Sequence, residues 1–162
     1  LERALKESGY GQAPLGRAQG VAFHESFGSI VCQVAEIEVV SEGEVKVHRV
    51  VSVVDCGRVV NPDIVSAQIE GGMALGLSAA IGEIVDIEGG AVKQRNFDGY
   101  PILTMAQCPE SDVYIIESKE EPGGIGEPGV PPIAAALCNA LFQGTGRRIR
   151  RLPLSRQGIQ AI

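Results

Sequence analysis

The stretch "ESKEEPGGIGEPGVPP", residues 117 to 132, limits the possible folds of this chain more than any other segment. It holds four prolines and four glycines, so it can form neither a helix nor an inner strand of a sheet. We expect a stiff loop, with Pro131 and Pro132 in the first turn of a helix that follows it. The fold must therefore be built from elements on both sides of a rigid connection.

One glutamate of this loop, Glu127, stands between Gly126 and Pro128. Pro128 disfavours helical angles at Glu127, and Gly126 permits unusual angles just before it. A carboxylate held on such a loop has little freedom to move, which suits a general base. The pattern alone nevertheless favours a simpler interpretation, a solvated turn or a helix cap, because turns rich in glycine and proline are common.

Strand and helix patterns mix along the chain without a regular repeat. Strands are expected at 29–40 and 44–57, joined by a turn at "SEGE", and shorter ones at 83–94 and 112–118. Helices are expected at 1–8, from Pro62 to before Gly82, and at 131–142 with Gly144 as a stop signal. This mixture predicts an α+β fold. We divide the chain into a helix end and linker, 1–18, and one domain, 19–162.

The second expected helix combines a clear start with an unusual interior. Asn61 can cap it, and an apolar stripe repeats every four residues at Val65, Ile69, Met73 and Leu77. Three glycines lie inside it: Gly71, Gly72 and Gly76. Because each mid-helix glycine costs about 1 kcal/mol relative to alanine, we expect a close approach of another backbone or a ligand there.

Charge and cysteine spacing exclude several functions. The net charge of −6 argues against a nucleic-acid partner. No stretch has the length expected of a membrane-spanning helix, so we expect no membrane insertion by this segment. The basic cluster "GRRIRR" at 146–151 is interpreted as a solvated face, with a phosphate contact as the alternative. The cysteines form no CxxC pair, so we predict that all four are buried free thiols and bind no metal: Cys32, Cys56, Cys108 and Cys138. The two histidines, His24 and His48, lie far apart in the sequence, so we expect no metal site from them either.

Two stretches, "VVDCGRVVNPDIVSAQIEGGMALGLSAAIGE" at 53–83 and "GGIGEPGVPPIAAALCNAL" at 123–141, resemble one known family. They are similar to the C-terminal part of the molybdenum-binding large subunit in the xanthine oxidase and aldehyde oxidase family. The branch they resemble most is the isoquinoline 1-oxidoreductase beta-subunit type, which "GRAQGVAFHESFGSIVCQVAEIEV" at 16–39 also fits. The resemblance rests on NP, QIEGG and GEPG in this order, and GEPG replaces the GEPP of xanthine-type members as a branch difference.

The resemblance implies the mixed strands and helices of the C-terminal portion of a molybdenum cofactor-binding domain. In that family a molybdenum–pterin cofactor hydroxylates a carbon next to a heteroatom, or a carbonyl carbon, with oxygen from water. A glutamate of the GEP motif acts as the base, and this role carries over to Glu127. Gln68 matches a family glutamine near the pterin, and Gly71 and Gly72 match the small residues that follow. An ordinary polar helix face is the alternative for Gln68.

The resemblance also implies cofactors and partners. These are a molybdopterin cytosine dinucleotide cofactor, 2Fe–2S clusters on a small iron–sulfur subunit, the remainder of the large subunit, and a small-molecule substrate, either an N-heteroaromatic compound or an aldehyde. The chain opens inside a helix-like stretch, so we take it as a piece of a longer protein of the bacterial periplasm or cytoplasm, inactive alone. The alternative is a cofactor-free binding or assembly domain that kept the fold without the chemistry.

Overall fold

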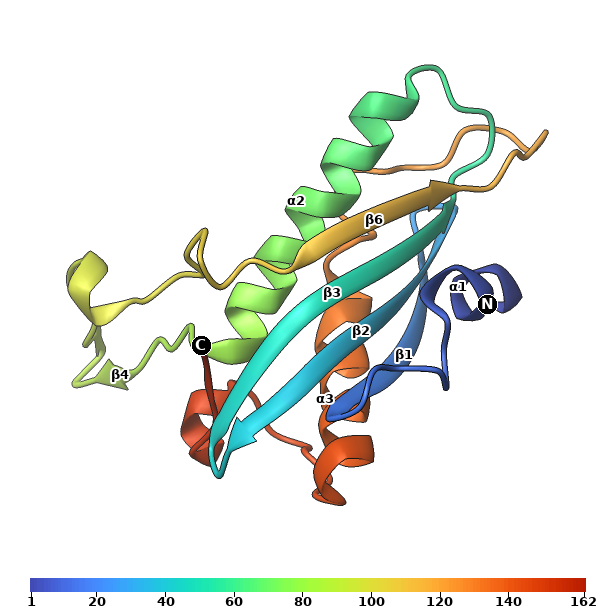
Figure 1. Cartoon of the computed structure of the whole chain (residues 1–162). Coiled ribbons are helices and arrows are strands. Elements are labelled where there is room, and N and C mark those ends of the chain that lie inside the picture. The colour runs from blue at the N-terminus through green and yellow to red at the C-terminus, as the bar shows by residue number, and fades with distance from the viewer.

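A five-stranded sheet forms the centre of the structure (Figure 1). The computed structural model describes all 162 residues, and its main strands lie in the order β1 (Arg17–Ser26), β2 (Ser29–Ser41), β3 (Glu44–Asp55) and β6 (Glu110–Ile115). The first three are antiparallel neighbours, whereas β6 runs parallel to β3, as does the short β7 (Gln160–Ala161). The expected α+β class and the turn at "SEGE" are confirmed.

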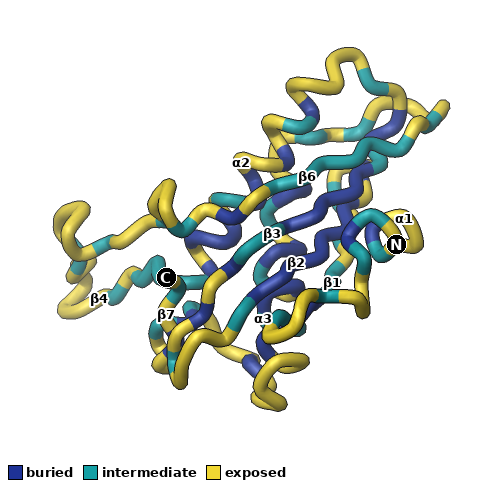
Figure 2. Tube along the Cα trace, in the orientation of Figure 1, coloured by how far each residue is buried: buried dark blue, intermediate teal, exposed yellow.

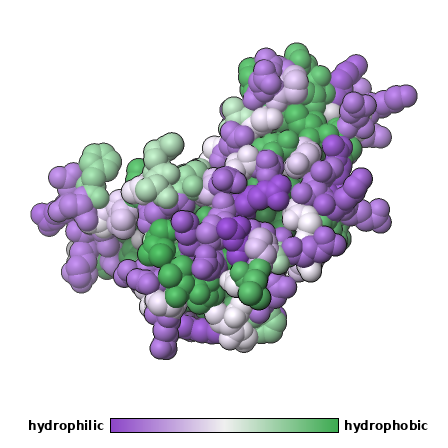
Figure 3. Space-filling model, viewed as in Figure 1, coloured by the Kyte–Doolittle hydropathy of each residue, from purple (hydrophilic) through white to green (hydrophobic).

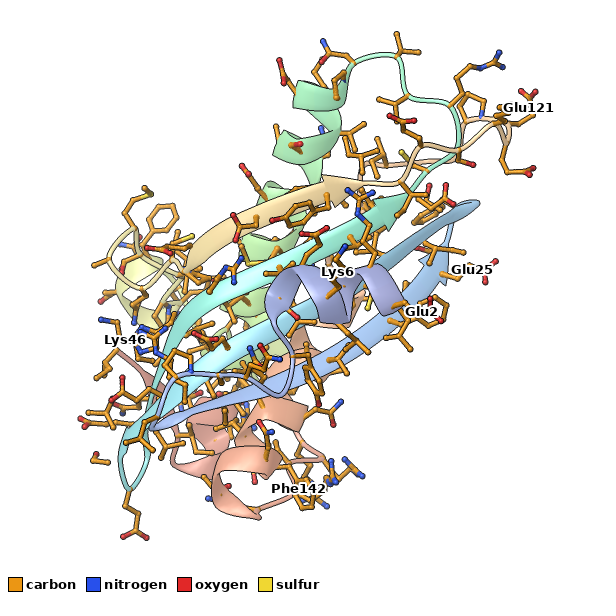
Figure 4. The ribbon with its side chains drawn as sticks, turned by 45° about the vertical axis from the view of Figure 1, so that its right-hand side comes forward. Glu2, Lys6, Glu25, Lys46, Glu121 and Phe142 are labelled. Atoms are coloured by element: carbon orange, nitrogen blue, oxygen red, sulfur yellow. The ribbon has the colours of Figure 1, made fainter.

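Helices cover both faces of the sheet. α2 (Pro62–Ile81) and α3 (Pro131–Thr145) pack on one face, and α1 (Glu2–Ser8) lies on the other (Figures 1 and 4). β2 and β3 are consequently buried along most of their length, as the dark tube in Figure 2 shows. Burial on both faces explains why the apolar alternation in these strands is imperfect, since both sets of side chains need to be apolar.

α2 begins and packs as its sequence predicts. The Asn61 side chain accepts hydrogen bonds from the backbone N–H groups of Asp63 and Ile64, at 3.1 and 3.2 Å. All four residues of the expected apolar stripe are buried. By length and composition alone α2 could cross a membrane, contrary to the expectation that no stretch is long enough. Its packing against α3 and the sheet is that of a core helix.

Two elements near the ends of the chain differ from expectation. β1 was not expected, because small and polar residues interrupt its apolar pattern. Gly20 is needed there since α3 crosses β1, and a Cβ atom would overlap the α3 backbone near Ala136 and Ala140. α3 continues through Gly144, whose added Cβ would lie 3.2 Å from Ala18, and ends at Gly146 in the left-handed conformation. The glycine expected to stop the helix is thus a packing glycine.

An arm formed by residues 83–107 extends from the sheet, at the left of Figure 1. It holds the two-residue strands β4 (Ile87–Glu88) and β5 (Ala91–Val92) and the short helix η1 (Phe97–Gly99). Asp86 in the arm accepts a hydrogen bond from Gln94 and pairs with Arg156 in the short helix η2 (Leu154–Gln157). The Gln94 hydrogen bond, and then Arg156, hold the pKa of Asp86 below its usual value.

The four thiols are free but not equally buried. Cys32 and Cys56 are buried and Cys138 is half-buried, and burial raises the pKa of each. Cys108 is exposed at the end of the arm, contrary to the expectation that all four thiols are buried.

We expect iodoacetamide at about pH 8 to modify Cys108 first in the folded protein, because the thiolate is the reacting form and the other thiols are buried or half-buried with raised pKa values. Peptide mass spectrometry after short labelling times measures this order. Protein unfolded in urea serves as the control and should lose the preference. Labelling of Cys32 as fast as Cys108 in folded protein would contradict the burial described here.

Candidate functional site

The loop between β6 and α3 crosses the first half of α2, as the orange trace in Figure 1 shows. Its buried Gly129 lies against the α2 backbone, because a Cβ atom on Gly129 would come within 2.9 Å of the Ile69 carbonyl oxygen. From the helix side, a Cβ on Gly72 would lie 3.3 Å from Gly129, and one on Gly76 would overlap the Val130 carbonyl. Glycines on both segments permit this contact, which brings the QIEGG and GEPG motifs together.

Further contacts fix this loop before and after Glu127. The Gly123 N–H donates to the Cys56 carbonyl at 2.9 Å, and the Gly124 N–H donates to the Phe27 carbonyl at 2.8 Å. After Glu127, the Gln33 side chain donates to the Gly129 carbonyl at 3.2 Å. The loop is therefore attached to the β1–β2 turn, to the end of β3 and to the middle of β2, which leaves its backbone little freedom.

Glu127 stands exposed on this fixed backbone while the next two residues, Pro128 and Gly129, are buried. Its carbonyl accepts a hydrogen bond from the Val130 N–H at 2.9 Å. The N-cap of α3 is Val130, and no side chain caps the helix, so the interpretation of Glu127 as a helix cap is wrong. None of the chain's ion pairs includes Glu127. Its carboxylate is exposed, which agrees both with the expected base and with the alternative of a solvated turn.

The other acidic residues of the loop lie elsewhere. Glu121 is at the outer tip, pointing away from the body of the molecule in Figure 4, and its side chain is 90% exposed. It forms a long ion pair with Arg58, at 3.5 Å. Glu120 is exposed beside it. Of the glutamates in this stretch, Glu127 is the one that adjoins the contact with α2.

The three α2 residues expected to bind a cofactor occupy different surroundings. Gln68 is exposed one helical turn before Gly72, so its side chain starts beside the strip of α2 that contacts the loop. Gly71 is exposed, and no heavy atom lies within 4 Å of the position of an added Cβ. Gly72 is buried against Gly129. Gly72 is thus explained by the approach of a second backbone, whereas Gly71 leaves an open, side-chain-free surface.

The chemistry of these groups is compatible with binding the polar edge of a ligand. The Gln68 amide can both donate and accept hydrogen bonds, the open surface at Gly71 admits close approach, and the Glu127 carboxylate accepts protons. No group of three or more His, Cys, Asp or Glu side chains in the chain could hold a metal ion. A metal at this site would therefore need ligands from outside the chain.

Two supports of the loop were not anticipated from the sequence. The turn at Phe27 has a left-handed backbone, φ 54°, which is unusual for a residue other than glycine. Gln33 is fully buried in the middle of β2. A single amide inside the apolar run "IVCQVA" is the signal that could have pointed to Gln33, since a buried polar side chain needs a specific partner.

Comparison with known proteins gives consistent matches. Residues 2–109 match a family model described as a molybdopterin cofactor-binding domain. The isoquinoline 1-oxidoreductase subunit beta of Brevundimonas diminuta is 39% identical over 140 residues, which cover 86% of this chain and 18% of that protein. A membrane-bound aldehyde dehydrogenase (pyrroloquinoline-quinone) of Gluconacetobacter polyoxogenes is 39% identical over 114 residues, 70% of this chain and 15% of that protein.

A solved structure shares the fold. The crystal structure of quinoline 2-oxidoreductase from Pseudomonas putida 86 superposes with a TM-score of 0.72 at 24% identity, covering 78% of this chain and 17% of that one. The chain thus spans 18%, 15% and 17% of the lengths of these three proteins. The family model ends at residue 109, before the GEPG loop, so it does not test the role expected for Glu127.

Proposed function

This chain belongs to the molybdopterin cofactor-binding domain family, and from that premise we propose that it forms part of the catalytic subunit of a molybdenum hydroxylase. The observation that carries the proposal is the packing of the GEPG loop on the QIEGG helix, which leaves Glu127 and Gln68 exposed near one contact. The names of the relatives support an N-heteroaromatic compound or an aldehyde as substrate. The proposal takes water as the source of the oxygen.

Each site residue has a separate task in this proposal. The bound cofactor supplies the two-electron oxidation of the substrate carbon. Glu127 accepts the proton that the water-derived oxygen gives up, and the fixed loop backbone keeps its carboxylate in place. Gln68 binds a polar edge of the cofactor through its amide, and Gly71 admits close approach. Gly72 contributes indirectly, because it holds Gly129 and with it the loop.

The proposal includes partners outside this chain. We assign the cofactor as molybdopterin cytosine dinucleotide, and a small subunit with 2Fe–2S clusters would be its electron acceptor. The remainder of the large subunit completes the pocket around the domain at 19–162. Figure 3 shows apolar atoms gathered where α2 begins, at the end that includes the exposed Val60 and Ile64. Such an exposed apolar patch supports packing against further parts of the subunit.

We expect the complete subunit with its partners to contain about one molybdenum per chain by elemental analysis. The Gln68→Ala variant should lose part of this molybdenum while its circular dichroism stays unchanged, because a contact to the cofactor is removed from an exposed position. Glu70→Ala, exposed on another side of α2, is the matched control and should keep its molybdenum. A folded, assembled protein without molybdenum would instead support the cofactor-free binding domain.

A further inference from the structure

Gln33 is a fully buried amide on the sheet face that carries α2 and α3. Val31 and Ala35, two residues away on either side, are buried on the same face and belong to its apolar clusters. An apolar side chain at position 33 would continue this packing without desolvating a polar group. Burying an amide is unfavourable unless hydrogen bonds compensate, so its presence needs a specific reason.

The hydrogen bonds of Gln33 show what it does. Its Nε2 group donates to the carbonyl of Gly129, the second residue after Glu127, across 96 positions of sequence. Its Oε1 atom has no partner in the chain, and neither has the hydroxyl of Ser52, which lies opposite on β3. The one hydrogen bond that the side chain makes within the protein is the bond to the loop.

Gly129 is held from two sides, by α2 and by Gln33. The α2 backbone at Ile69 lies against it, and the Gln33 amide reaches it from β2. Gly129 has no side chain of its own that could set its position. Glu127 lies two residues earlier in the loop and is itself exposed.

We propose that Gln33 is a positioning residue, which fixes the carboxylate of Glu127 by holding the Gly129 carbonyl from the sheet. It touches no reacting atom and acts only through the loop. This inference rests on the proposed function, because Glu127 must be a base for its position to matter. The alternative is that Gln33 only satisfies a buried carbonyl and contributes stability without any effect on the reaction.

The first test replaces Gln33 with Met, which keeps the length of the side chain and removes the donor. In the complete enzyme, Gln33→Met should lower kcat by about 10- to 100-fold with KM changed less than about twofold, since misplacing a catalytic group acts on the reaction more than on substrate binding. Molybdenum content should stay unchanged. Amide hydrogen exchange in the segment 122–132 should become faster, a readout that does not depend on activity.

Gln19→Met is the matched control. Gln19 is also a buried amide, 2% exposed. Its side chain accepts from the Gly11 N–H at 2.9 Å, donates to the Glu36 carboxylate at 3.2 Å, and donates to the Ser8 carbonyl at 3.3 Å. The bond to Ser8 ties α1 to the opposite face of the sheet, away from the loop. Gln19→Met should therefore lower stability while leaving kcat and exchange in 122–132 near those of the native enzyme.

A second variant, Gln33→Glu, makes the bond depend on pH and remains informative if Gln33→Met does not fold. Burial raises the pKa of a carboxyl, and the protonated form can donate its O–H to the Gly129 carbonyl. The ionised form cannot donate and places a negative charge beside the carbonyl oxygen. The ratio of variant to native kcat should therefore be highest at low pH and fall as pH rises through the raised pKa.

The outcomes distinguish failure of the positioning role of Gln33 from failure of the proposed function. Faster loop exchange in Gln33→Met with native kcat, or a flat pH ratio in Gln33→Glu, would leave Gln33 a purely structural residue and overturn the inference. Unchanged loop exchange would show that Gln33 does not hold the loop. The proposed function is tested separately: it fails if the assembled protein lacks molybdenum or if Glu127→Gln stays active, whatever the Gln33 variants do.

Discussion

Replacing Glu127 with Gln in the complete enzyme should lower turnover by about 10²- to 10⁴-fold, or about 3–5 kcal/mol in the barrier. Gln keeps the size and hydrogen-bonding reach of Glu but cannot accept the proton at neutral pH. Because Glu127 is exposed and takes part in no ion pair, the substitution should disturb neither folding nor molybdenum content. Steady-state kinetics with an artificial dye acceptor measures turnover, and elemental analysis measures molybdenum content.

Glu120→Gln and Glu121→Gln are the controls for this experiment. They remove the same charge from the same loop, but Glu121 lies at the outer tip and Glu120 is exposed beside it. A general effect of charge would penalise all three variants alike, whereas a base would make Glu127→Gln stand apart. If Glu127→Gln kept near-normal turnover with cofactor bound, Glu127 would not be the base and the loop would be only a turn.

Gly76→Ala should destabilise the protein by about 1–3 kcal/mol through overpacking. An added Cβ would overlap the Val130 carbonyl and lie 2.7 Å from the Ile133 side chain, at the point where the loop becomes α3. Backbone atoms cannot move aside as a flexible side chain does, so α2 and α3 must separate. Urea denaturation followed by circular dichroism measures the loss.

Gly71→Ala is the matched substitution in the same helix. No atom lies within 4 Å of its added Cβ, so alanine should stabilise the chain by about 0.4–1 kcal/mol through backbone entropy. The changes in the free energy of unfolding should therefore have opposite signs in Gly76→Ala and Gly71→Ala. Equal effects at both positions would contradict the close contact between α2 and the loop. A Gly71→Ala enzyme that gains stability but loses molybdenum would support cofactor approach at this surface.

The sequence predicts those parts of the fold that depend on neighbours along the chain. The Asn61 cap, the stripe of α2 and the turn before Glu44 follow from local patterns, and each is confirmed. The contact between the QIEGG and GEPG motifs could be expected only from the resemblance, because nothing local joins them. The glycines of α2 likewise indicate that something approaches the helix without showing whether it is a backbone or a ligand.

The remaining features depend on partners distant in sequence, which no local pattern reveals. Gly20 weakens the strand pattern of β1 because α3 must cross it, and Gly144 imitates a stop signal although it packs against Ala18. The role of Gln33 becomes visible only when Gly129 is placed beside it. Tertiary contacts override local propensity at these positions.

The loop attachments also set an order of folding. β1, β2 and β3 pair through short turns and can form early, whereas the loop must reach back to Gln33 across 96 residues. Closing so long a segment is entropically unfavourable, so we expect the loop contacts to form after the strand pairs and to open before them. The antiparallel strands therefore act as a template that exists before the site does. Denaturant too weak to unfold the sheet should release Glu127 first, and activity should disappear before secondary structure.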